Sequence, residues 1–562
     1  MSPAQTPFPA NPMKIRFLAS LLLGGVAAAA PRPNIVVILA DDLGWSDLGC
    51  FGGEIPTPHM DALARSGLRF TQFYNNSVCG PSRASLLTGL YAQRVGHEGT
   101  KWNQPTDYGR CITLGEALQA AGYRTMAVGK WQDPEMPAQR GFNRFYGPLC
   151  SGKISYFSEV ATNPFYLDET RVGLPADFYL TDALTGQALN FLEEAWVLAR
   201  ERHQPFFLYF AHVAPHWPLH AREPDIAPHR SRYREKGWNG WSAARRANQL
   251  REGLIPADFK SAPWPADIGD WREDRHQGWQ AERMAVHAAM VASIDASTGR
   301  LIDAIKQAGQ FENTLFLLLS DNGAAPDGGL QPTDRMLGFS PGSNSARTFR
   351  LDGVPLRTGS GPDNLPGPPN TFAAYGMAWA LTSNTPFRST KLTGYEGGIR
   401  TPLIAHWPAG IRQPGRIVRE VGHVMDFMPT VLELAGTEYP RILGERHPLP
   451  LDGRSLVPAF QGKPRPPRGT LGWSVPRHRV LRQGIWKIIA PTTADAWELY
   501  DLEQDPGETT DLATAHADVR RRMIAHWERW RIDVQALRQG PSGNFPRIPD
   551  VPDRSRLPTR PE

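Results

Sequence analysis

Residues 34–42 read Asn34-Ile-Val-Val-Ile-Leu-Ala40-Asp41-Asp42, and this stretch decides the fold class. Its apolar run contains no polar position and begins with four β-branched residues, Ile35 to Ile38. An apolar run without alternation is typical of a strand that is buried on both faces. The stretch therefore predicts a central strand of a parallel sheet, with helices on both sides and two carboxylates at its carboxyl end.

Similar short apolar runs recur along the chain, and helical patterns separate them. The further runs lie at residues 125–128, 206–210, 315–319 and 403–407. Apolar residues spaced three and four positions apart, as in amphipathic helices, occur at residues 113–121, 181–200 and 281–308. Strands that alternate with helices predict an α/β fold with a doubly wound, mixed or parallel sheet.

Two stretches interrupt this alternation. Residues 222–280 are rich in Trp, Arg and Pro, and residues 326–370 are rich in Gly and Pro. In open α/β sheets, ligands bind beyond the carboxyl ends of the strands, and long loops often form the pocket there. We therefore predict that both stretches are surface insertions close to a binding pocket.

The pattern changes after about Pro414. A predicted helix at 426–435 is followed by two segments, 480–489 and 497–502, that are expected to pair as antiparallel strands, and then by a helix at 518–531. We predict a main domain over residues 31–414, a smaller α+β domain over 415–540 and a Pro-rich tail over 541–562.

The first 30 residues have the pattern of an export signal with an N-terminal extension. Lys14 and Arg16 precede an apolar run from Phe17, which ends in the small residues Ala27 to Ala30. The run is short for a membrane span, and no later segment approaches the ~18 apolar residues that a span needs. We expect cleavage near Ala30 and a periplasmic or secreted protein without a membrane span.

Composition and charge are those of an ordinary globular protein. The net charge of +5 comes mostly from scattered Arg, which argues against nucleic acid as a partner and permits a small anionic substrate. The spacing of the four cysteines, at positions 50, 79, 111 and 150, matches no metal-ligand pattern and leaves any disulfide pairing open.

Oxygen ligands follow two of the predicted strands. Asp41 and Asp42 end the first strand, and Asp321-Asn322-Gly323 follows the run at 315–319. Each motif alone is equally typical of a helix cap or a turn, but together they place four oxygen-donor side chains at two strand ends. Such ligands suit a hard cation, calcium or magnesium.

A third motif begins at Cys79. Cys79-Gly-Pro-Ser-Arg83 leads into an apolar pattern with helical spacing, and Pro81 suits the first turn of a helix. Cys79 would then lie at a helix N-terminus, where free N–H groups and the helix dipole favour anions. A lone cysteine is more often a core residue, but this five-residue pattern favours a chemical role.

Cys79-Gly-Pro-Ser-Arg83, followed by Leu86-Leu-Thr-Gly89, strongly resembles the signature of the type I sulfatases of the alkaline phosphatase superfamily, closest to bacterial arylsulfatases. The resemblance extends over nearly the whole chain after residue 30. Its further motifs are Ala40-Asp-Asp-Leu-Gly44, Val128-Gly-Lys-Trp131, Ala214-Pro-His-Trp-Pro-Leu219, Ser320-Asp-Asn-Gly323, Tyr395-Glu-Gly-Gly-Ile-Arg400 and Glu498-Leu-Tyr-Asp501.

The resemblance implies a fold, a reaction and a set of residues. The implied reaction is hydrolysis of aryl or carbohydrate sulfates by a formylglycine that a separate formylglycine-generating enzyme makes from Cys79. It implies calcium, with magnesium less favoured, bound by Asp41, Asp42, Cys79, Asp321 and Asn322. The implied catalytic and sulfate-binding residues are Arg83, Lys130, His216 and Lys391, with Ser151 beside the site. One hydroxyl of the hydrated aldehyde attacks sulfur, and the other expels sulfate, which a Ser or Cys nucleophile cannot do.

One position departs from the family. After Gly129-Lys-Trp131 the family usually has a His that assists sulfate release, whereas this chain has Gln132. An amide forms hydrogen bonds but does not accept a proton near neutral pH. We therefore expect that sulfate release is slower, or that another group, such as His97, assists it in place of the missing His.

Two other functions remain open on the sequence alone. A phosphodiesterase or phosphonate monoester hydrolase of the same superfamily would act on a tetrahedral centre of similar charge. A sulfate-ester binding protein of low activity is suggested only by Gln132, because the other matched positions are intact.

Overall fold

The computed structural model describes residues 32–97, 105–133, 135–149, 155–159, 163–326, 357–358, 361–362 and 364–536. The predicted signal segment, Cys150, Ser151, most of the insertion at 326–370 and the Pro-rich tail lie outside the described residues. The described chain from Arg32 onward belongs to one compact unit. None of its helices combines the length and the apolar character that crossing a membrane requires.

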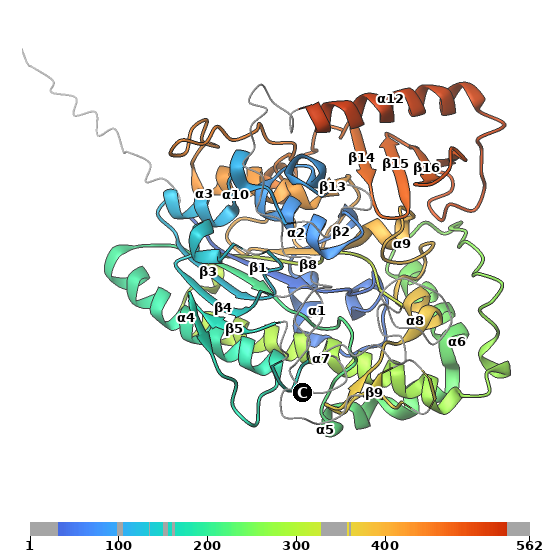
Figure 1. Cartoon of the computed structure of the whole chain (residues 1–562), viewed down its shortest axis with the longest axis horizontal. Coiled ribbons are helices and arrows are strands. Elements are labelled where there is room, and N and C mark those ends of the chain that lie inside the picture. Colours follow the sequence, from blue (N-terminus) through green and yellow to red (C-terminus); the bar gives the residue numbers. More distant parts are fainter. Residues whose placement is uncertain are drawn as a thin grey trace, which may run out of the picture. The chain divides into compact units, whose positions relative to one another are not determined.

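A mixed sheet forms the centre of this unit (Figure 1). Within the described residues it has eleven strands, in the order β12-β2-β11-β8-β1-β7-β3-β4-β5-β6, with β13 beside β2. The bounds are β1 Asn34–Ala40, β2 Leu68–Tyr74, β3 Arg124–Gly129, β4 Arg144–Pro148, β5 Phe165–Leu167, β6 Thr170–Val172, β7 Phe206–Ala211, β8 Thr314–Ser320, β11 Arg400–His406, β12 Ile417–Val418 and β13 Gly422–His423. The pairings β8-β1-β7-β3-β4 are parallel, whereas β11 is antiparallel to both β8 and β2.

Strand β1 shows why its sequence predicted this fold. All seven of its residues are buried. Val36 and Ile38 pack into the core on one face of the sheet, and Ile35, Val37 and Leu39 pack into the core on the other, because successive side chains of a strand point to opposite faces. The prediction of a doubly wound α/β fold with a mixed sheet is confirmed.

Helices cover both faces of the sheet. One layer contains α1 Pro58–Arg65, α4 Leu180–Arg202, α6 Arg230–Arg251, α7 Gln277–Gln307 and α8 Gly376–Ser383. The other contains α2 Cys79–Thr88, α3 Leu114–Ala120, α10 Phe427–Ala435 and α11 Val457–Phe460. In Figure 1, α2, α3 and α10 lie on one side of the central strands, and α1, α4 and α7 lie on the other.

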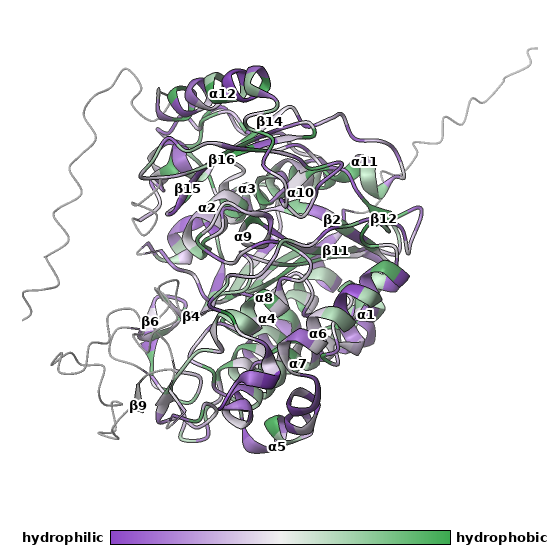
Figure 2. Cartoon of the chain, turned by 90° about the vertical axis from the view of Figure 1, so that its right-hand side faces the viewer, coloured by the Kyte–Doolittle hydropathy of each residue, from purple (hydrophilic) through white to green (hydrophobic). Residues whose placement is uncertain are grey.

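A second, antiparallel sheet lies near the end of the described chain. Its order is β14 Thr470–Ser474, β15 His478–Gln483, β16 Trp486–Pro491 and β17 Glu498–Asp501. Helix α12, Ala517–Ala536, combines hydrophilic and hydrophobic residues (Figure 2) and packs Met523, Trp527 and Trp530 into the core of this sheet. The domain boundary near Pro414 stays a prediction, and β12 and β13, which follow it, extend the main sheet.

Two expectations need correction. The segment 480–489, predicted as one strand, forms two strands, β15 and β16, with a turn at Gly484-Ile485; β16 then pairs with β17 as expected. The Trp-rich insertion is largely helical, because it contains α5 Glu223–Ile226, α6 and the start of α7. Its Trp238 and Trp271 pack edge to face with each other and against Trp379, so these three indoles belong to the core.

Candidate functional site

The predicted site residues come from the carboxyl ends of adjacent strands. Asp41 follows β1 and Asp321 follows β8, and these strands pair in register up to Ala40 opposite Ser320. Lys130 follows β3, and His216 lies in the loop after β7. Because carboxyl ends of parallel strands meet at one edge of a sheet, these side chains lie at the same edge.

Cys79 and Lys391 reach this edge from other elements. Cys79 is the first residue of α2 and follows β2, which is separated from β8 by the antiparallel strand β11. Lys391 lies in the segment after α8 and is held by its N–H, which donates to Ala324 O at 3.0 Å. Its Nζ lies 3.6 Å from Cys79 Sγ and 2.5 Å from Asp42 Oδ1.

The oxygen ligands and the thiol form one compact group. Ligand atoms of Asp41, Cys79 and Asp321 lie within 4.8 Å of one another, and so do those of Asp41, Asp42 and His216. All five residues are buried. The structure thus brings together residues that are far apart in the sequence.

Three buried oxygens in this group have no hydrogen-bond partner among the described residues. They are Asp41 Oδ1, Asp42 Oδ2 and Asn322 Oδ1. The Asn322 amide is oriented by its Nδ2, which donates to Asp42 Oδ1 at 2.6 Å and to Gly323 O at 2.9 Å. Unsatisfied buried oxygens are unfavourable, and several that converge are the donor set of a hard cation. The residues present therefore fit a calcium or magnesium ion.

Three permanent cations balance the three carboxylates. Lys130 Nζ lies 2.5 Å from Asp41 Oδ2, Lys391 pairs with Asp42, and Arg83 donates from Nε and Nη2 to Asp321 Oδ2 at 2.9 and 2.8 Å. With all three carboxylates ionised the set is neutral, and a bound divalent cation would make it positive. Such a positive site attracts an anionic ester.

The charges also set the protonation of the site. Burial raises the pKa of the Asp41 carboxyl, but the cations Lys130, Arg83 and Lys391 more than offset this, so its pKa lies below its usual range. Burial lowers the pKa of Lys391, whereas the nearby Asp42 and Cys79 outweigh this effect and raise it. Asp41 is thus ionised and Lys391 is charged at neutral pH.

His216 is neutral in this environment. Burial lowers the pKa of its imidazole, despite the opposing effect of Asp42 and Asp41. Its Nδ1 lies 2.5 Å from Trp217 O, and since a carbonyl only accepts, Nδ1 carries the hydrogen. Nε2, 3.6 Å from Asp42 Oδ2, then has a lone pair and can accept a proton or bind a cation.

Close backbone contacts hold Asn322 in place. A Cβ at Gly323 would lie 1.8 Å from Gly397 O, and a Cβ at Gly397 would lie 2.2 Å from Ser389 O. Only glycine fits at both positions. This explains why Gly323 follows Asn322 and why Gly397 follows Glu396, whose carboxylate binds Lys487 on β16 and Arg400.

Gln132, where this chain differs from the family, follows Lys130 by two residues. Gln132 has a positive φ of 67°, and its Oε1 is buried without a hydrogen-bond partner in the described part of the chain. His97, considered above as a substitute, has its Nε2 3.1 Å from Thr106 Oγ1. The roles of both residues, and that of Ser151, stay predictions.

Cys50, Cys111 and His212 do not belong to the group of ligand atoms described above. Among the described residues, Cys50, Cys79 and Cys111 are free thiols. His212, beside the site in sequence, packs against Phe210, and burial lowers its pKa to about 3, so it is neutral.

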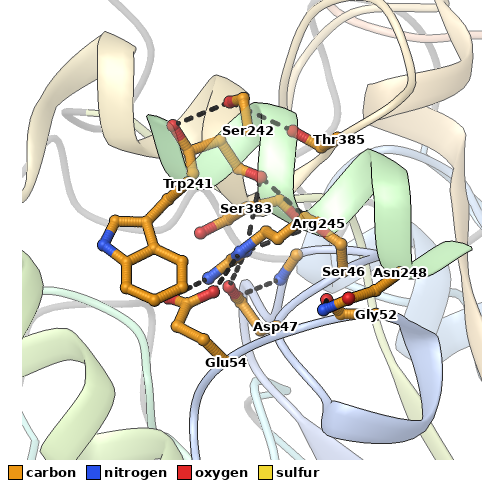
Figure 3. Close-up of polar contacts among 12 residues, drawn as sticks. Ser46, Asp47, Gly52, Glu54, Trp241, Ser242, Arg245, Asn248, Ser383 and Thr385 are labelled. Carbon is orange, nitrogen blue, oxygen red and sulfur yellow. Dashed lines mark hydrogen bonds and ion pairs between the residues drawn. The ribbon is translucent and has the colours of Figure 1, made fainter. Parts of the chain in front are cut away.

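A buried charge network that the sequence did not predict supports the loop after Asp42 (Figure 3). Arg245 of α6 is fully buried; its Nη1 donates to Asp47 Oδ1 at 2.9 Å, and its Nε and Nη2 donate to the two oxygens of Glu54. Asp47 Oδ2 accepts from Gly44 N at 2.9 Å and lies 3.2 Å from His287 Nε2. The helical insertion is thus fixed to the loop that follows the metal-binding carboxylates.

Substitution of Arg245 by Met is expected to lower the free energy of unfolding by about 3–5 kcal/mol, because two buried carboxylates lose the arginine that binds both. Urea unfolding measures the effect, with Arg251→Met at the exposed end of the same helix as control. A loss of less than ~1 kcal/mol, similar to that of a surface pair, would contradict this role of the network.

Comparisons with known proteins agree with this geometry. A family model described as Sulfatase matches residues 33–437, and one described as N-sulphoglucosamine sulphohydrolase, C-terminal, matches residues 390–532. An uncharacterised sulfatase of Schizosaccharomyces pombe is 34% identical over 543 residues, which cover 89% of this chain and 93% of that protein. The arylsulfatase of Klebsiella aerogenes is 34% identical over 481 residues, which cover 80% and 97%.

Solved structures show the same fold. A protein in complex with its substrate D-glucosamine-2-N,6-O-disulfate has a TM-score of 0.60 and 21% identity to this chain, over 91% of this chain and 99% of that one.

Proposed function

The chain belongs to the sulfatase family and is a sulfuric ester hydrolase, and we propose that it acts through a formylglycine made from Cys79 and a bound calcium ion. The observation that carries the proposal is that the ligand atoms of Cys79, Asp41 and Asp321 lie within 4.8 Å of one another. This arrangement supports a cation site that includes the modifiable residue. The substrates we propose are aryl or carbohydrate sulfates.

The cation would be held by Asp41, Asp42, Asp321, Asn322 and the modified side chain at position 79. The three unpartnered oxygens support this assignment, and magnesium is the less favoured ion. When bound, the cation would polarise the sulfate ester and the attacking hydroxyl as a Lewis acid. It would also add positive charge to a set in which three cations face three carboxylates.

The chain's own cations would bind and orient the sulfate group. Lys130 and Lys391 are buried beside the carboxylates, and charged donors of this kind stabilise charge that spreads over the sulfate oxygens in the transition state. Lys391 carries a proton at neutral pH and lies 3.6 Å from Cys79 Sγ, so it is suited to assist the leaving alcohol. Neutral His216 is suited to accept a proton.

The hydrate of formylglycine would supply one hydroxyl that attacks sulfur as the alcohol leaves, and a second that expels sulfate as the aldehyde re-forms. Arg83, one helical turn after Cys79, fixes Asp321 and donates from Nη1 to Lys130 O at 3.1 Å. It therefore connects the nucleophile helix to two other site residues. The matured side chain depends on a formylglycine-generating enzyme as partner.

The test is turnover of 4-nitrophenyl sulfate in the presence of calcium. Protein co-expressed with a formylglycine-generating enzyme is compared with protein expressed without it, and mass spectrometry measures conversion of Cys79. We expect turnover in proportion to the converted fraction. Full conversion without turnover of this ester, but with hydrolysis of a phosphodiester, would overturn the proposal.

Gln132→His is expected to raise kcat for 4-nitrophenyl sulfate at least about 100-fold if sulfate release limits turnover, since positioned general bases contribute about 10²- to 10⁴-fold. Gln132→Asn is the matched control, because it keeps an amide. Pre-steady-state kinetics should show a burst of 4-nitrophenol in the parent and none in Gln132→His. An unchanged kcat and burst would show that Gln132 does not limit release.

We also propose that the protein is exported to the periplasm or secreted. The support is the basic and apolar pattern of residues 14–30, which ends in four alanines. N-terminal sequencing of protein from cell fractions tests it: a start near residue 31 in the exported fraction is expected, and intact protein confined to the cytoplasm would contradict it.

A further inference from the structure

A cavity of about 430 Å³ lies between the helical insertion and the segment that leads to Lys391. One wall comes from α6 and from residues 261–265, and the other from α8, residues 385–389 and Tyr395. None of the residues assigned above to catalysis or cation binding lines it. Its volume is in the range of small-ligand sites.

The lining combines features that suit a sugar with an acidic substituent. It contains three aromatic rings, those of Trp264, Phe387 and Tyr395, four hydroxyl side chains and two arginines, but no carboxylate. Aromatic faces pack against the apolar faces of sugar rings, while hydroxyl groups and arginines supply polar contacts. The absence of lining carboxylates favours an anion over a cation.

The two arginines differ in the contacts that they form with other protein groups. Arg388 stacks 4.0 Å above the Tyr395 ring, donates to Tyr500 Oη and Glu508 O, and lies 3.9 Å from Glu498. Arg246 donates from Nη2 to Phe259 O, and among the described residues it forms no ion pair with a carboxylate. Arg246 therefore supplies the positive charge that an acidic ligand can neutralise.

The cavity wall is also part of the segment that holds the reaction site. Asn384 Oδ1 accepts from Ala324 N at 3.0 Å, and Lys391 N donates to Ala324 O. Residues 385–389, between these two anchors, line the cavity. A ligand in the cavity thus lies against the same segment that positions Lys391.

We propose that this cavity is an accessory site for a sulfated sugar, separate from the site at Cys79, with Trp264 against the ring and Arg246 on the sulfate group. This inference rests on the proposed function, because it takes the occupant to be part of a carbohydrate sulfate on which the enzyme acts. It goes further by assigning a second place at which such a carbohydrate binds.

Calorimetry with a sulfated glucosamine disaccharide and its desulfated counterpart tests the proposal. The parent is full-length Cys79→Ala protein, which cannot hydrolyse the probe. We expect two binding sites for the sulfated disaccharide, and a loss of at least tenfold in affinity at one of them in Arg246→Gln and in Trp264→Ala. Arg234→Gln, an exposed position on the same helix, is the control and should retain both sites.

Binding and activity measurements then separate the accessory site from the proposed function. Equal stoichiometry and affinity in all variants, no binding at all, or equal binding of the desulfated probe would overturn the accessory site. With Cys79 intact and matured, Arg246→Gln should keep its kcat/KM for 4-nitrophenyl sulfate within twofold. If no variant hydrolyses this ester but the binding difference persists, the proposed function fails and the accessory site stands.

Discussion

Cys79→Ala is expected to lower kcat for 4-nitrophenyl sulfate at least ~10⁴-fold, as loss of a nucleophile does in enzymes that form covalent intermediates. Lys130, Lys391 and Arg83 remain in this variant and should still bind the sulfate group of the ester. The measurement is steady-state turnover of protein from cells that contain the formylglycine-generating enzyme. Cys111→Ala, which removes another buried free thiol, is the matched control.

Cys79→Ser separates the two steps of the reaction. Its single hydroxyl can attack sulfur and release the alcohol, but it lacks the second hydroxyl through which sulfate leaves. We expect one equivalent of 4-nitrophenol and a serine that carries the sulfo group, detected by mass spectrometry. Sustained turnover in either Cys79 variant would show that another group is the nucleophile.

Asp41→Asn is expected to weaken calcium binding more than ~100-fold, because changes to residues that only orient ligands already cost 10- to 100-fold. The variant loses a negative charge beside Lys130 and Arg83 and keeps the size of the side chain. Calcium content by mass spectrometry and the calcium-dependent rise of the melting temperature measure the effect.

Asp168→Asn serves as its control, since Asp168 pairs with Arg144 outside the site. In the parent and in this control, calcium should raise the melting temperature by the same amount. Full calcium content in Asp41→Asn would place the cation elsewhere. A parent that binds no calcium would show that Lys130, Lys391 and Arg83 suffice to balance the carboxylates.

The sequence predicted the sheet well because its central strands are continuous apolar runs. It also predicted that Asp41 and Asp321 lie close together, since both follow such runs. The proximity of Cys79 could not be derived in this way: β2 joins the sheet beyond the antiparallel β11, so its order is not evident from the chain. That part of the site came only from the resemblance to known sulfatases.

Other features escaped prediction for local physical reasons. Ile485 is an exposed apolar residue in the turn after β15. Because it is apolar, residues 480–489 were predicted as one strand and not as a hairpin. Arg245 lies in a helix rich in charged residues, where an arginine is usually solvated. Its burial depends on Asp47 and Glu54, nearly 200 positions earlier, and no local pattern indicates such a partnership.

The burial of Cys79 has a consequence for the order of events in the cell. Its side chain is 4% exposed, and every residue of α2 that follows is buried except Gly80. A second enzyme cannot reach this thiol in the folded protein. The proposed oxidation of Cys79 would therefore have to precede folding, while the chain is still extended. Protein refolded from the unmodified chain would remain inactive, and adding the maturing enzyme afterwards would not restore it.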